Sequence, residues 1–240
     1  IDIMLAIDVS TSMLAEDLKP NRLEAAKDVA AEFINGRPND NIGITLFAGE
    51  TFTQCPLTVD HAVLLDMIHN IKCGLITDGT AVGMGIANAV TRLKDSKAKS
   101  KVIILLTDGT NNKGDISPMT AAEIAKSFGI RVYTIGVGTN GMAPYPYPVG
   151  NTVQYVSMPV EIDEKTLTEI AGTTDGNYFR ATSNSKLKEV YEEIDKLEKT
   201  KLNVKEYSKR DEEYHWFALA AFLCVLLEVL LPNSVLKKIP

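Results

Sequence analysis

The sequence predicts a doubly wound, Rossmann-like α/β fold with a mainly parallel sheet and one antiparallel edge strand. Short apolar runs alternate with helix-period patterns along the chain, which is the order typical of βα units. Several of the runs are almost continuously apolar, as strands covered on both faces are. With 240 residues and 45% hydrophobic residues, the chain is long enough to bury a large core.

The predicted strands are the short apolar runs. Residues 41–48 and 101–107 are apolar at nearly every position, which indicates central strands. Residues 51–54 follow the loop Ala48-Gly49-Glu50, which is too short for a parallel crossover, so we expect an antiparallel edge strand there. The full set comprises residues 1–9, 41–48, 51–54, 101–107, 130–137 and 176–181.

Amphipathic patterns fill the intervals between these runs. The first has apolar residues at helical spacing from Leu23 to Ile34 and ends before Gly36 and Pro38. Asp60 is the expected N-cap of the second. The predicted helices cover about residues 23–34, 63–71, 80–93, 121–128, 163–171 and 185–199.

One segment of the domain breaks this alternation. Residues 139–158 contain three alternate prolines and cannot be helical, so we expect a loop or a small hairpin. The segment follows a strand, which places it at the carboxyl edge of the sheet. The stretch 136–141 matches G-x-G-x-x-G, but no helix follows it, so a dinucleotide site is excluded.

Oxygen-bearing side chains follow two of the central strands. Asp8, Ser10 and Ser12 lie at the end of the first apolar run, Asp108 follows the strand 101–107, and Thr80 opens the third predicted helix. An Asp-x-Ser-x-Ser stretch alone is also typical of a turn that caps a helix. In a parallel sheet, however, ligands bind at the carboxyl ends of the strands. Carboxylate and hydroxyl oxygens are the ligands that a magnesium-sized cation prefers, so these five residues are the candidate metal ligands.

The five candidate ligands resemble a known site. Asp8-x-Ser10-x-Ser12, Thr80 in Asp-Gly-Thr-Ala and Asp108 in Leu-Thr-Asp-Gly are similar to the metal-ion-dependent adhesion site of von Willebrand factor type A domains. The resemblance spans residues 1 to about 199. It implies that the serines and the threonine bind the ion, that the aspartates act directly or through water, and that an acidic residue of a partner completes the shell. Mg²⁺ is the expected ion, and Mn²⁺ or Ca²⁺ could replace it.

Further stretches are similar to the BatA branch of the Bacteroides aerotolerance proteins. They are residues 12–17, residues 20–23 and the apolar segment near the C-terminus. This resemblance implies a membrane-anchored domain outside the cytoplasm, on the periplasmic side of the bacterial inner membrane, with a link to oxygen or stress tolerance. Its expected partners are proteins that present Asp or Glu, including other membrane proteins of the same system.

Two classes of function follow from a metal site of this kind. The favoured one is a binding module, not an enzyme, that recruits an acidic group of a partner through the metal. Tyr145, Tyr147 and Tyr155 would then form a specificity rim, although the same segment is also typical of an ordinary surface loop. The alternative is a Mg²⁺-dependent hydrolase. Against it, no side chain suited to general-base catalysis accompanies the candidate ligands.

Four segments organise the chain. Residues 1–199 form the predicted domain, 200–215 a charged juxtamembrane segment, 216–231 a transmembrane helix and 232–240 a short tail. Sixteen residues give a helix of about 24 Å, short of the roughly 30 Å hydrocarbon core. Packing of this helix on the domain or on another copy is therefore the alternative. Because the chain opens within a strand and without Met, we expect it to belong to a longer protein.

Charge and the remaining reactive side chains narrow the choice of function. A net charge of −6 gives no support for nucleic-acid binding. Lysines and arginines before the apolar segment favour a cytoplasmic domain, whereas the family resemblance implies a periplasmic one, which we prefer.

Cys55 and Cys73 are either free buried thiols, as we expect, or a disulfide. Glu16 and Asp17 are more typical of a helix N-terminus than of a second metal site.

Overall fold

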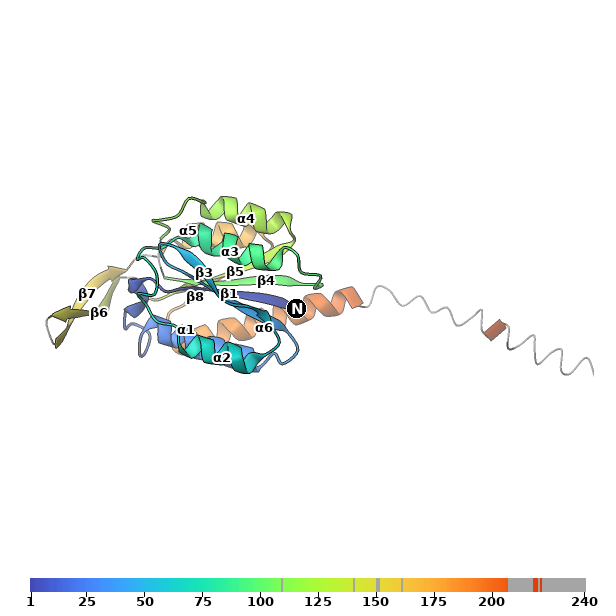
Figure 1. The fold of residues 1–240 in the computed structure, drawn as a ribbon, viewed down its shortest axis with the longest axis horizontal. Helices are drawn as coiled ribbons and strands as arrows, with labels where there is room; N and C mark the ends of the chain where they lie inside the picture. The colour runs from blue at the N-terminus through green and yellow to red at the C-terminus, as the bar shows by residue number, and fades with distance from the viewer. Residues whose placement is uncertain are drawn as a thin grey trace, which may run out of the picture. The chain divides into compact units, whose positions relative to one another are not determined.

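The computed structural model describes residues 1–206, apart from positions 109, 140, 150, 151 and 161, together with residues 218, 219 and 221. Within these residues the main sheet has six strands in the order β3-β2-β1-β4-β5-β8 (Figure 1). The strands are β1 (Asp2–Asp8), β2 (Asn41–Phe47), β3 (Thr51–Thr58), β4 (Lys101–Thr107), β5 (Ile130–Val137) and β8 (Tyr178–Ala181).

The strand pairing confirms the predicted fold class. β1 pairs in parallel with both β2 and β4, β4 pairs in parallel with β5, and β5 with β8. β3 pairs antiparallel with β2 at the edge, as its short link predicts, although it continues to Thr58 rather than ending at Gln54. The chain winds outward from β1 in one direction and restarts at β4 in the other. The carboxyl ends of β1 and β4 are therefore the switch point of the sheet, where ligands bind in such folds.

Helices cover both faces of the sheet (Figure 1). One face carries α1, α2 and α6, and the other carries α3, α4 and α5. The helices are α1 (Arg22–Asn35), α2 (His61–His69), α3 (Val82–Leu93), α4 (Pro118–Ser127), α5 (Glu164–Thr173) and α6 (Asn184–Glu206), and a 3₁₀ turn, η1 (Thr11–Leu14), follows β1. α3 begins two residues after Thr80, so Thr80 lies in the loop before the helix rather than in its first turn.

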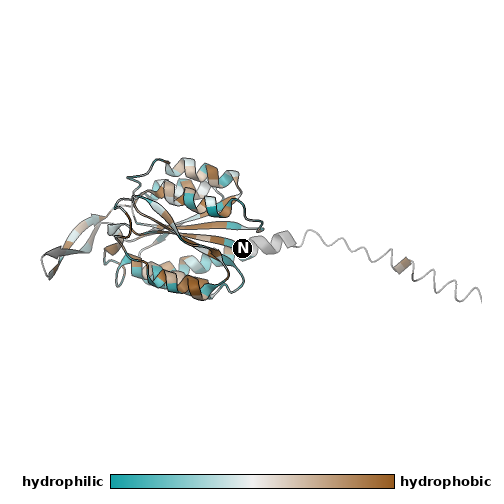
Figure 2. Ribbon diagram, viewed as in Figure 1, coloured by the Kyte–Doolittle hydropathy of each residue, from teal (hydrophilic) through white to brown (hydrophobic). Residues whose placement is uncertain are grey.

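The period of two along β1 divides its side chains between two apolar clusters. Ile3, Leu5 and Ile7 pack on the α1–α2–α6 face, whereas Met4 and Ala6 pack on the opposite face. All five side chains are at most 1% exposed. Figure 2 shows the same pattern as hydrophobic strands between helices of mixed hydropathy. β1 is close-packed on both faces and paired with a strand on each side, so the core fixes the backbone that carries Asp8.

The segment 139–158 contains a hairpin, one of the two forms expected for it. β6 (Gly141–Val149) and β7 (Thr152–Val160) pair antiparallel as a separate two-stranded sheet. The hairpin extends from the end of the domain where η1 lies, and the Glu16 N–H donates to the Pro144 carbonyl at 2.9 Å. It therefore lies at the carboxyl edge of the sheet.

The chain divides into two compact units, Ile1–Lys199 and Thr200–Pro240. Most of the segments predicted as juxtamembrane region, transmembrane helix and tail lie outside the described residues, except for residues 200–206, 218, 219 and 221. Among the residues that are described, no helix has the length and apolar character needed to cross a bilayer. The four-segment organisation stays a prediction.

Candidate metal centre

Two neighbouring strands bring the carboxylates of the candidate site together. Asp8 is the last residue of β1, and Asp108 directly follows β4. Because β1 and β4 are paired in parallel, their ends meet at the same edge of the sheet. Both side chains are buried, at 0% and 2% exposure. Two carboxyl groups buried at the end of a hydrophobic sheet lose their hydration, and hydrogen bonds or opposite charges must offset this cost. Such an arrangement indicates a functional site rather than an ordinary surface.

A continuous chain of polar contacts joins four of the five candidate ligands. The Ser10 N–H donates to Asp8 Oδ1 at 2.9 Å, and the Ser10 and Ser12 hydroxyls lie 2.9 Å apart. The Ser12 hydroxyl then donates to Asp108 Oδ1 at 2.7 Å. The other Asp8 oxygen, Oδ2, accepts from the Thr107 hydroxyl at 2.6 Å. Residues up to 100 positions apart in sequence thus form one cluster of oxygen atoms.

The fifth candidate ligand is held by a different set of contacts. Thr80 is 4% exposed, its N–H donates to the Asn112 side chain at 2.9 Å, and its carbonyl accepts from the Asn112 N–H. In the part of the chain that is described, its hydroxyl has no hydrogen bond to the other four. The two loops are joined nearby instead, since the N–H and the hydroxyl of Thr11 both donate to Asp78. Asp78, two residues before Thr80, therefore attaches the loop that carries Thr80 to the loop that carries the serines.

Burial and mutual repulsion make the two aspartates reluctant to ionise together. Burial first, and then the negative charge of Asp108, raises the pKa of Asp8 to about 7. Burial likewise raises the pKa of Asp108, although the adjacent Arg22 guanidinium opposes this shift. A bound cation would favour the ionised form of both groups, so metal binding and proton release are coupled at this site.

Arg22 is a member of the site that the sequence analysis did not single out. It is the largest fully buried side chain of the described residues, at 1% exposure. One of its amino groups donates to Asp108 Oδ2 at 2.7 Å, and its other two nitrogens form a bidentate pair with Asp17 at 2.7 Å each. Asp17 also accepts from the N–H and hydroxyl of Thr139. Although burial opposes ionisation, the hydrogen bonds from Arg22 and Thr139 lower the pKa of Asp17 to about 2.

The sequence contains one indication that Arg22 pairs with a buried carboxylate. Arg22 is the first residue of α1, after the N-cap Asn21, where the helix dipole favours negative rather than positive charge. A cation in that position needs a carboxylate partner from elsewhere. Asp17 is fully engaged by this ion pair, which argues against the alternative of a second metal site at Glu16 and Asp17.

The donor set fits a hard divalent cation. It contains carboxylate and hydroxyl oxygens only, and the described residues contain no cluster of three or more His, Cys, Asp or Glu side chains arranged to hold a metal. Asp8, Asp17 and Asp108 are compensated by one guanidinium, that of Arg22. The ionised cluster therefore carries a net charge of about −2, which one divalent ion would neutralise.

Among the described residues, we find no nucleophile or general base beside the candidate ligands. The Cys73 thiol lies next to it and donates to the Ser10 carbonyl at 3.4 Å, but burial and the nearby aspartates raise its pKa to about 12. The thiol therefore stays protonated and unreactive. His61 and His69 contact the backbone carbonyls of Asp40 and Leu65, and in the described part of the chain neither is bonded to a candidate ligand. Cys55 and Cys73 are free, as expected.

The three tyrosines that were predicted to form a specificity rim do not lie on one surface of the hairpin. Tyr145 lies opposite Val156, and Tyr147 lies opposite Gln154, so these two tyrosines share one face. Tyr155 lies opposite Pro146 and points to the other face. Tyr147 and Tyr155 are 56% and 62% exposed, whereas Tyr145 is half-buried.

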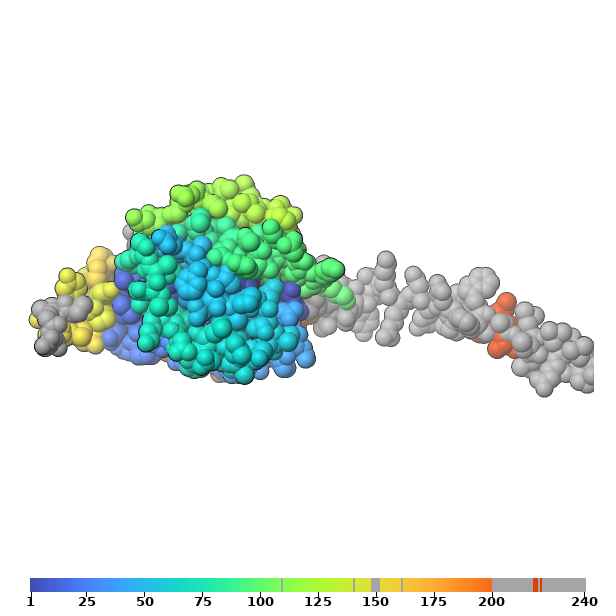
Figure 3. Space-filling view, in the orientation of Figure 1, coloured from blue at the N-terminus to red at the C-terminus, as the bar shows by residue number. Residues whose placement is uncertain are grey.

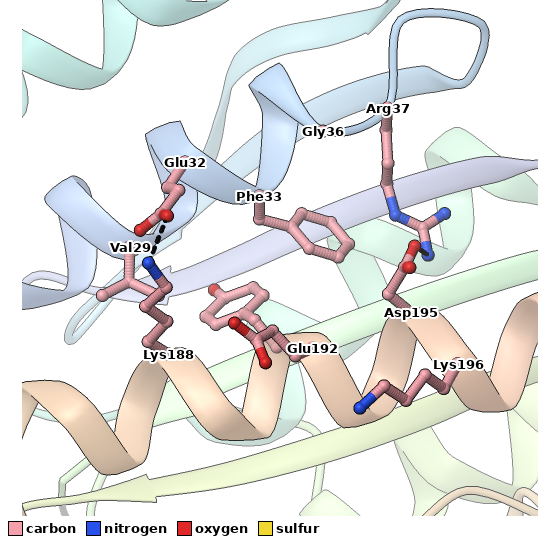
Figure 4. A pocket seen from close by; sticks show the side chains of 10 residues that line it. Val29, Glu32, Phe33, Gly36, Arg37, Lys188, Glu192, Asp195 and Lys196 are labelled. Atoms are coloured by element: carbon pink, nitrogen blue, oxygen red, sulfur yellow. Dashed lines mark hydrogen bonds and ion pairs between the residues drawn. The ribbon is translucent and has the colours of Figure 1, made fainter.

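The described residues form a cavity that does not contain the cluster. It has a volume of about 300 Å³ and lies between α1 and α6, where Phe33 and Tyr191 line it (Figure 4). The Arg37–Asp195 ion pair borders it at 2.6 Å. None of the five candidate ligands reaches this cavity, so the metal-ligand chemistry belongs to the sheet edge.

Fold and site together define a doubly wound α/β domain with an oxygen-rich cluster at its switch point. The chain belongs to the von Willebrand factor type A domain family, whose model matches residues 2–193. Domains of this family are typically protein-interaction modules and are often metal-dependent. The family resemblance in the sequence is thereby confirmed.

Proteins from several bacteria are similar to most of this chain. It is 28% identical over 240 residues to an uncharacterized protein of Borreliella burgdorferi, with 99% of this chain and 70% of that protein covered. It is 33% identical over 205 residues to a UPF0353 protein of Mycolicibacterium paratuberculosis, with 79% and 58% covered. The chain thus spans little more than half of that second relative.

Solved structures show the same fold. BatB from Bacteroides thetaiotaomicron is 34% identical, with a TM-score of 0.73, and the match covers 83% of this chain and 99% of that one. An aerotolerance-related membrane protein from Bacteroides fragilis is 34% identical, with a TM-score of 0.70 and coverage of 82% and 99%. A proximal thread matrix protein from mussel byssus, 25% identical with a TM-score of 0.63 and coverage of 82% and 45%, has a zinc-occupied MIDAS motif.

Proposed function

We propose that this domain binds one divalent cation, Mg²⁺ by preference, through Asp8, Ser10, Ser12, Thr80 and Asp108, and uses it to recruit an acidic group of a partner protein. The observation that carries the proposal is the continuous oxygen cluster from Asp8 to Asp108 at the switch point. Mn²⁺ and Ca²⁺ prefer the same oxygen ligands and would compete.

The chemistry of the donors favours recognition over catalysis. Hydroxyl ligands are neutral, so an ion that is held directly by three hydroxyls, with the aspartates acting through water, keeps much of its own positive charge and attracts a further carboxylate. An octahedral ion also has more positions than these short side chains fill. A hydrolase would need a base or nucleophile beside the ion, and the protonated Cys73 thiol serves as neither.

We place the domain in a membrane-anchored assembly with a role in oxygen or stress tolerance, on the periplasmic side of the bacterial inner membrane. Support comes from the similar Bacteroides fragilis structure, which is described as an aerotolerance-related membrane protein. The apolar segment 216–231 is the proposed anchor. Tyr145, Tyr147 and Tyr155 are the proposed rim for the partner, with the first two on one face of the hairpin and the third on the other.

Calorimetric titration of the full chain with Mg²⁺ tests the metal site. We expect one ion to bind, and both Asp8→Ala and Asp108→Ala to abolish the binding heat. Ser12→Ala keeps both buried carboxylates and removes one exposed hydroxyl ligand. It should weaken metal binding by at least about tenfold, because even the loss of an outer-shell partner lowers metal affinity by about that factor. Ser185→Ala, an exposed serine on α6, is the matched control. Unchanged affinity in both aspartate variants would refute the site.

A further inference from the structure

The two edges of the β6–β7 hairpin differ in their backbone chemistry. Pro144, Pro146 and Pro148 occupy alternate positions of β6. The Pro144 carbonyl accepts from the Glu16 N–H, so it points away from β7. Directly opposite residues in an antiparallel ladder exchange both hydrogen bonds or neither. By alternation, the backbone N and C=O of all three prolines point away from β7. The N–H groups that proline lacks would therefore make no hydrogen bond within the hairpin, and their absence does not weaken it.

The same alternation fixes the outer edge of β7. Ser157, Tyr155 and Val153 lie opposite the three prolines, so their N–H and C=O groups also point out of the hairpin. Among the described residues, β6 is the one strand that pairs with β7, and no backbone group of the domain bonds to these three. The edge therefore offers three donors and three acceptors at the spacing of a strand.

Between Val153 and Ser157 this edge lacks the usual protection against pairing, whereas Pro159, which faces the same way, ends the run of donors. Charged side chains normally guard exposed strands, but residues 141–160 contain none. Val153 and Tyr155 are 57% and 62% exposed. Part of the hairpin, in yellow, stands out beyond the body of the domain (Figure 3). The β6 edge, in contrast, has no donors at its prolines and is covered at its base by Glu16, so a strand can be added on the β7 side alone.

We propose that β7 pairs antiparallel with β7 of a second copy of this chain, giving a four-stranded sheet β6-β7-β7′-β6′. The edge is self-complementary about a two-fold axis at Tyr155, which then faces Tyr155 of the second copy, while Val153 faces Ser157 of the second copy. The Val153–Ser157 pair occurs twice about the axis, so there are three pairs in all, and together they exchange about six hydrogen bonds. The lack of charge avoids repulsion between identical surfaces. Since proline blocks both outer edges, assembly closes at two copies and does not continue into a fibre.

Sedimentation velocity of the full chain over a concentration series tests this pairing. We expect a reversible monomer–dimer equilibrium that is the same in Mg²⁺ and in EDTA, which separates it from the proposed metal function. Tyr155→Pro removes the outward N–H at the axis without touching the β6–β7 ladder. Tyr155→Ala loses the same ring but keeps the N–H, so it is the control, and the proline variant should dimerise about tenfold or more weakly than it. Equal dimerisation of the two variants overturns the proposal.

Cysteine cross-linking supplies a second, positional readout. In a chain with Cys55, Cys73 and Cys224 changed to Ala, Tyr155→Cys should form a disulfide dimer, because hydrogen-bonded partners in a ladder have Cα atoms about 5.5 Å apart. Tyr147→Cys is similarly exposed but lies on the far strand, so it should not. Equal cross-linking at both positions overturns the proposal. So does a wild-type chain that stays monomeric throughout, the result expected if a strand of another protein occupies this edge.

Discussion

At the scale of the residue, Arg22 determines how the candidate ligand Asp108 is held. Its guanidinium bridges Asp108 on one side and Asp17 on the other, entirely out of solvent. A planar fork with fixed donors can orient two carboxylates at once, whereas a lysine ammonium is a single point charge. Through Asp17, the same bridge reaches Thr139 at the base of the hairpin. Arg22 therefore positions a ligand without being one.

We expect Arg22→Lys to lower the metal affinity about 10- to 100-fold, the range found for outer-shell partners of metal ligands. The charge of the cluster is unchanged in this variant, so the loss reports orientation of Asp108 and not electrostatics. Calorimetric titration with Mg²⁺ measures it, with Arg92→Lys, an exposed arginine on α3, as the control. A folded Arg22→Lys protein with wild-type affinity would show that the bridge serves stability alone.

At the scale of the element, α6 is attached to the sheet by a buried carboxylate. Glu198 is 1% exposed and accepts from the hydroxyls of Ser100 and Tyr133 and from the Arg131 guanidinium. Burial opposes ionisation of Glu198, but these donors outweigh it and lower its pKa below the ordinary 4.5. A carboxylate with a lowered pKa in the folded state stabilises that state wherever it is ionised.

This contribution should depend on pH in a defined direction. It is complete above about pH 4.5, the ordinary pKa of glutamate, and is lost as the pH falls through the lower pKa of the folded state. Glu198→Gln should therefore reduce the free energy of unfolding by about 3 kcal/mol at pH 7 and by progressively less in acid. Urea denaturation at several pH values measures the difference. Glu189→Gln, an exposed residue of the same helix, should show no such trend.

At the scale of the whole molecule, the domain presents the cluster of candidate metal ligands and the hairpin at the same edge. We expect a pull-down from membranes in Mg²⁺ to retain proteins that are lost in EDTA. Thr80→Ala should lose the same proteins while it costs less metal binding, because a hydroxyl in a loop before a helix can move onto the ion as a carboxylate arrives. Equal losses of metal and partner binding would remove this switching role. Retention of the proteins by Thr80→Ala would exclude Thr80 from the site.

The sequence by itself determined the fold class and where the candidate ligands lie in it. Continuous apolar strands indicate a sheet that is covered on both faces, and the short link before β3 forces an antiparallel edge, so both were predictable from local patterns. Asp8 and Asp108 could be brought together because the ends of parallel strands meet. Each of these inferences rests on a pattern local to one strand and its flanks, together with the rule that parallel strands end at a shared edge.

Only the tertiary structure decided the contacts between distant segments. Arg22 and Asp108 are 86 positions apart, and Asp17 and Thr139 are 122 apart. No local pattern encodes which buried carboxylate an arginine reaches. The register of β6 and β7 similarly divided the tyrosines between two faces and left one open edge. Side-chain direction in a hairpin depends on pairing, and a shift of one residue would reverse it.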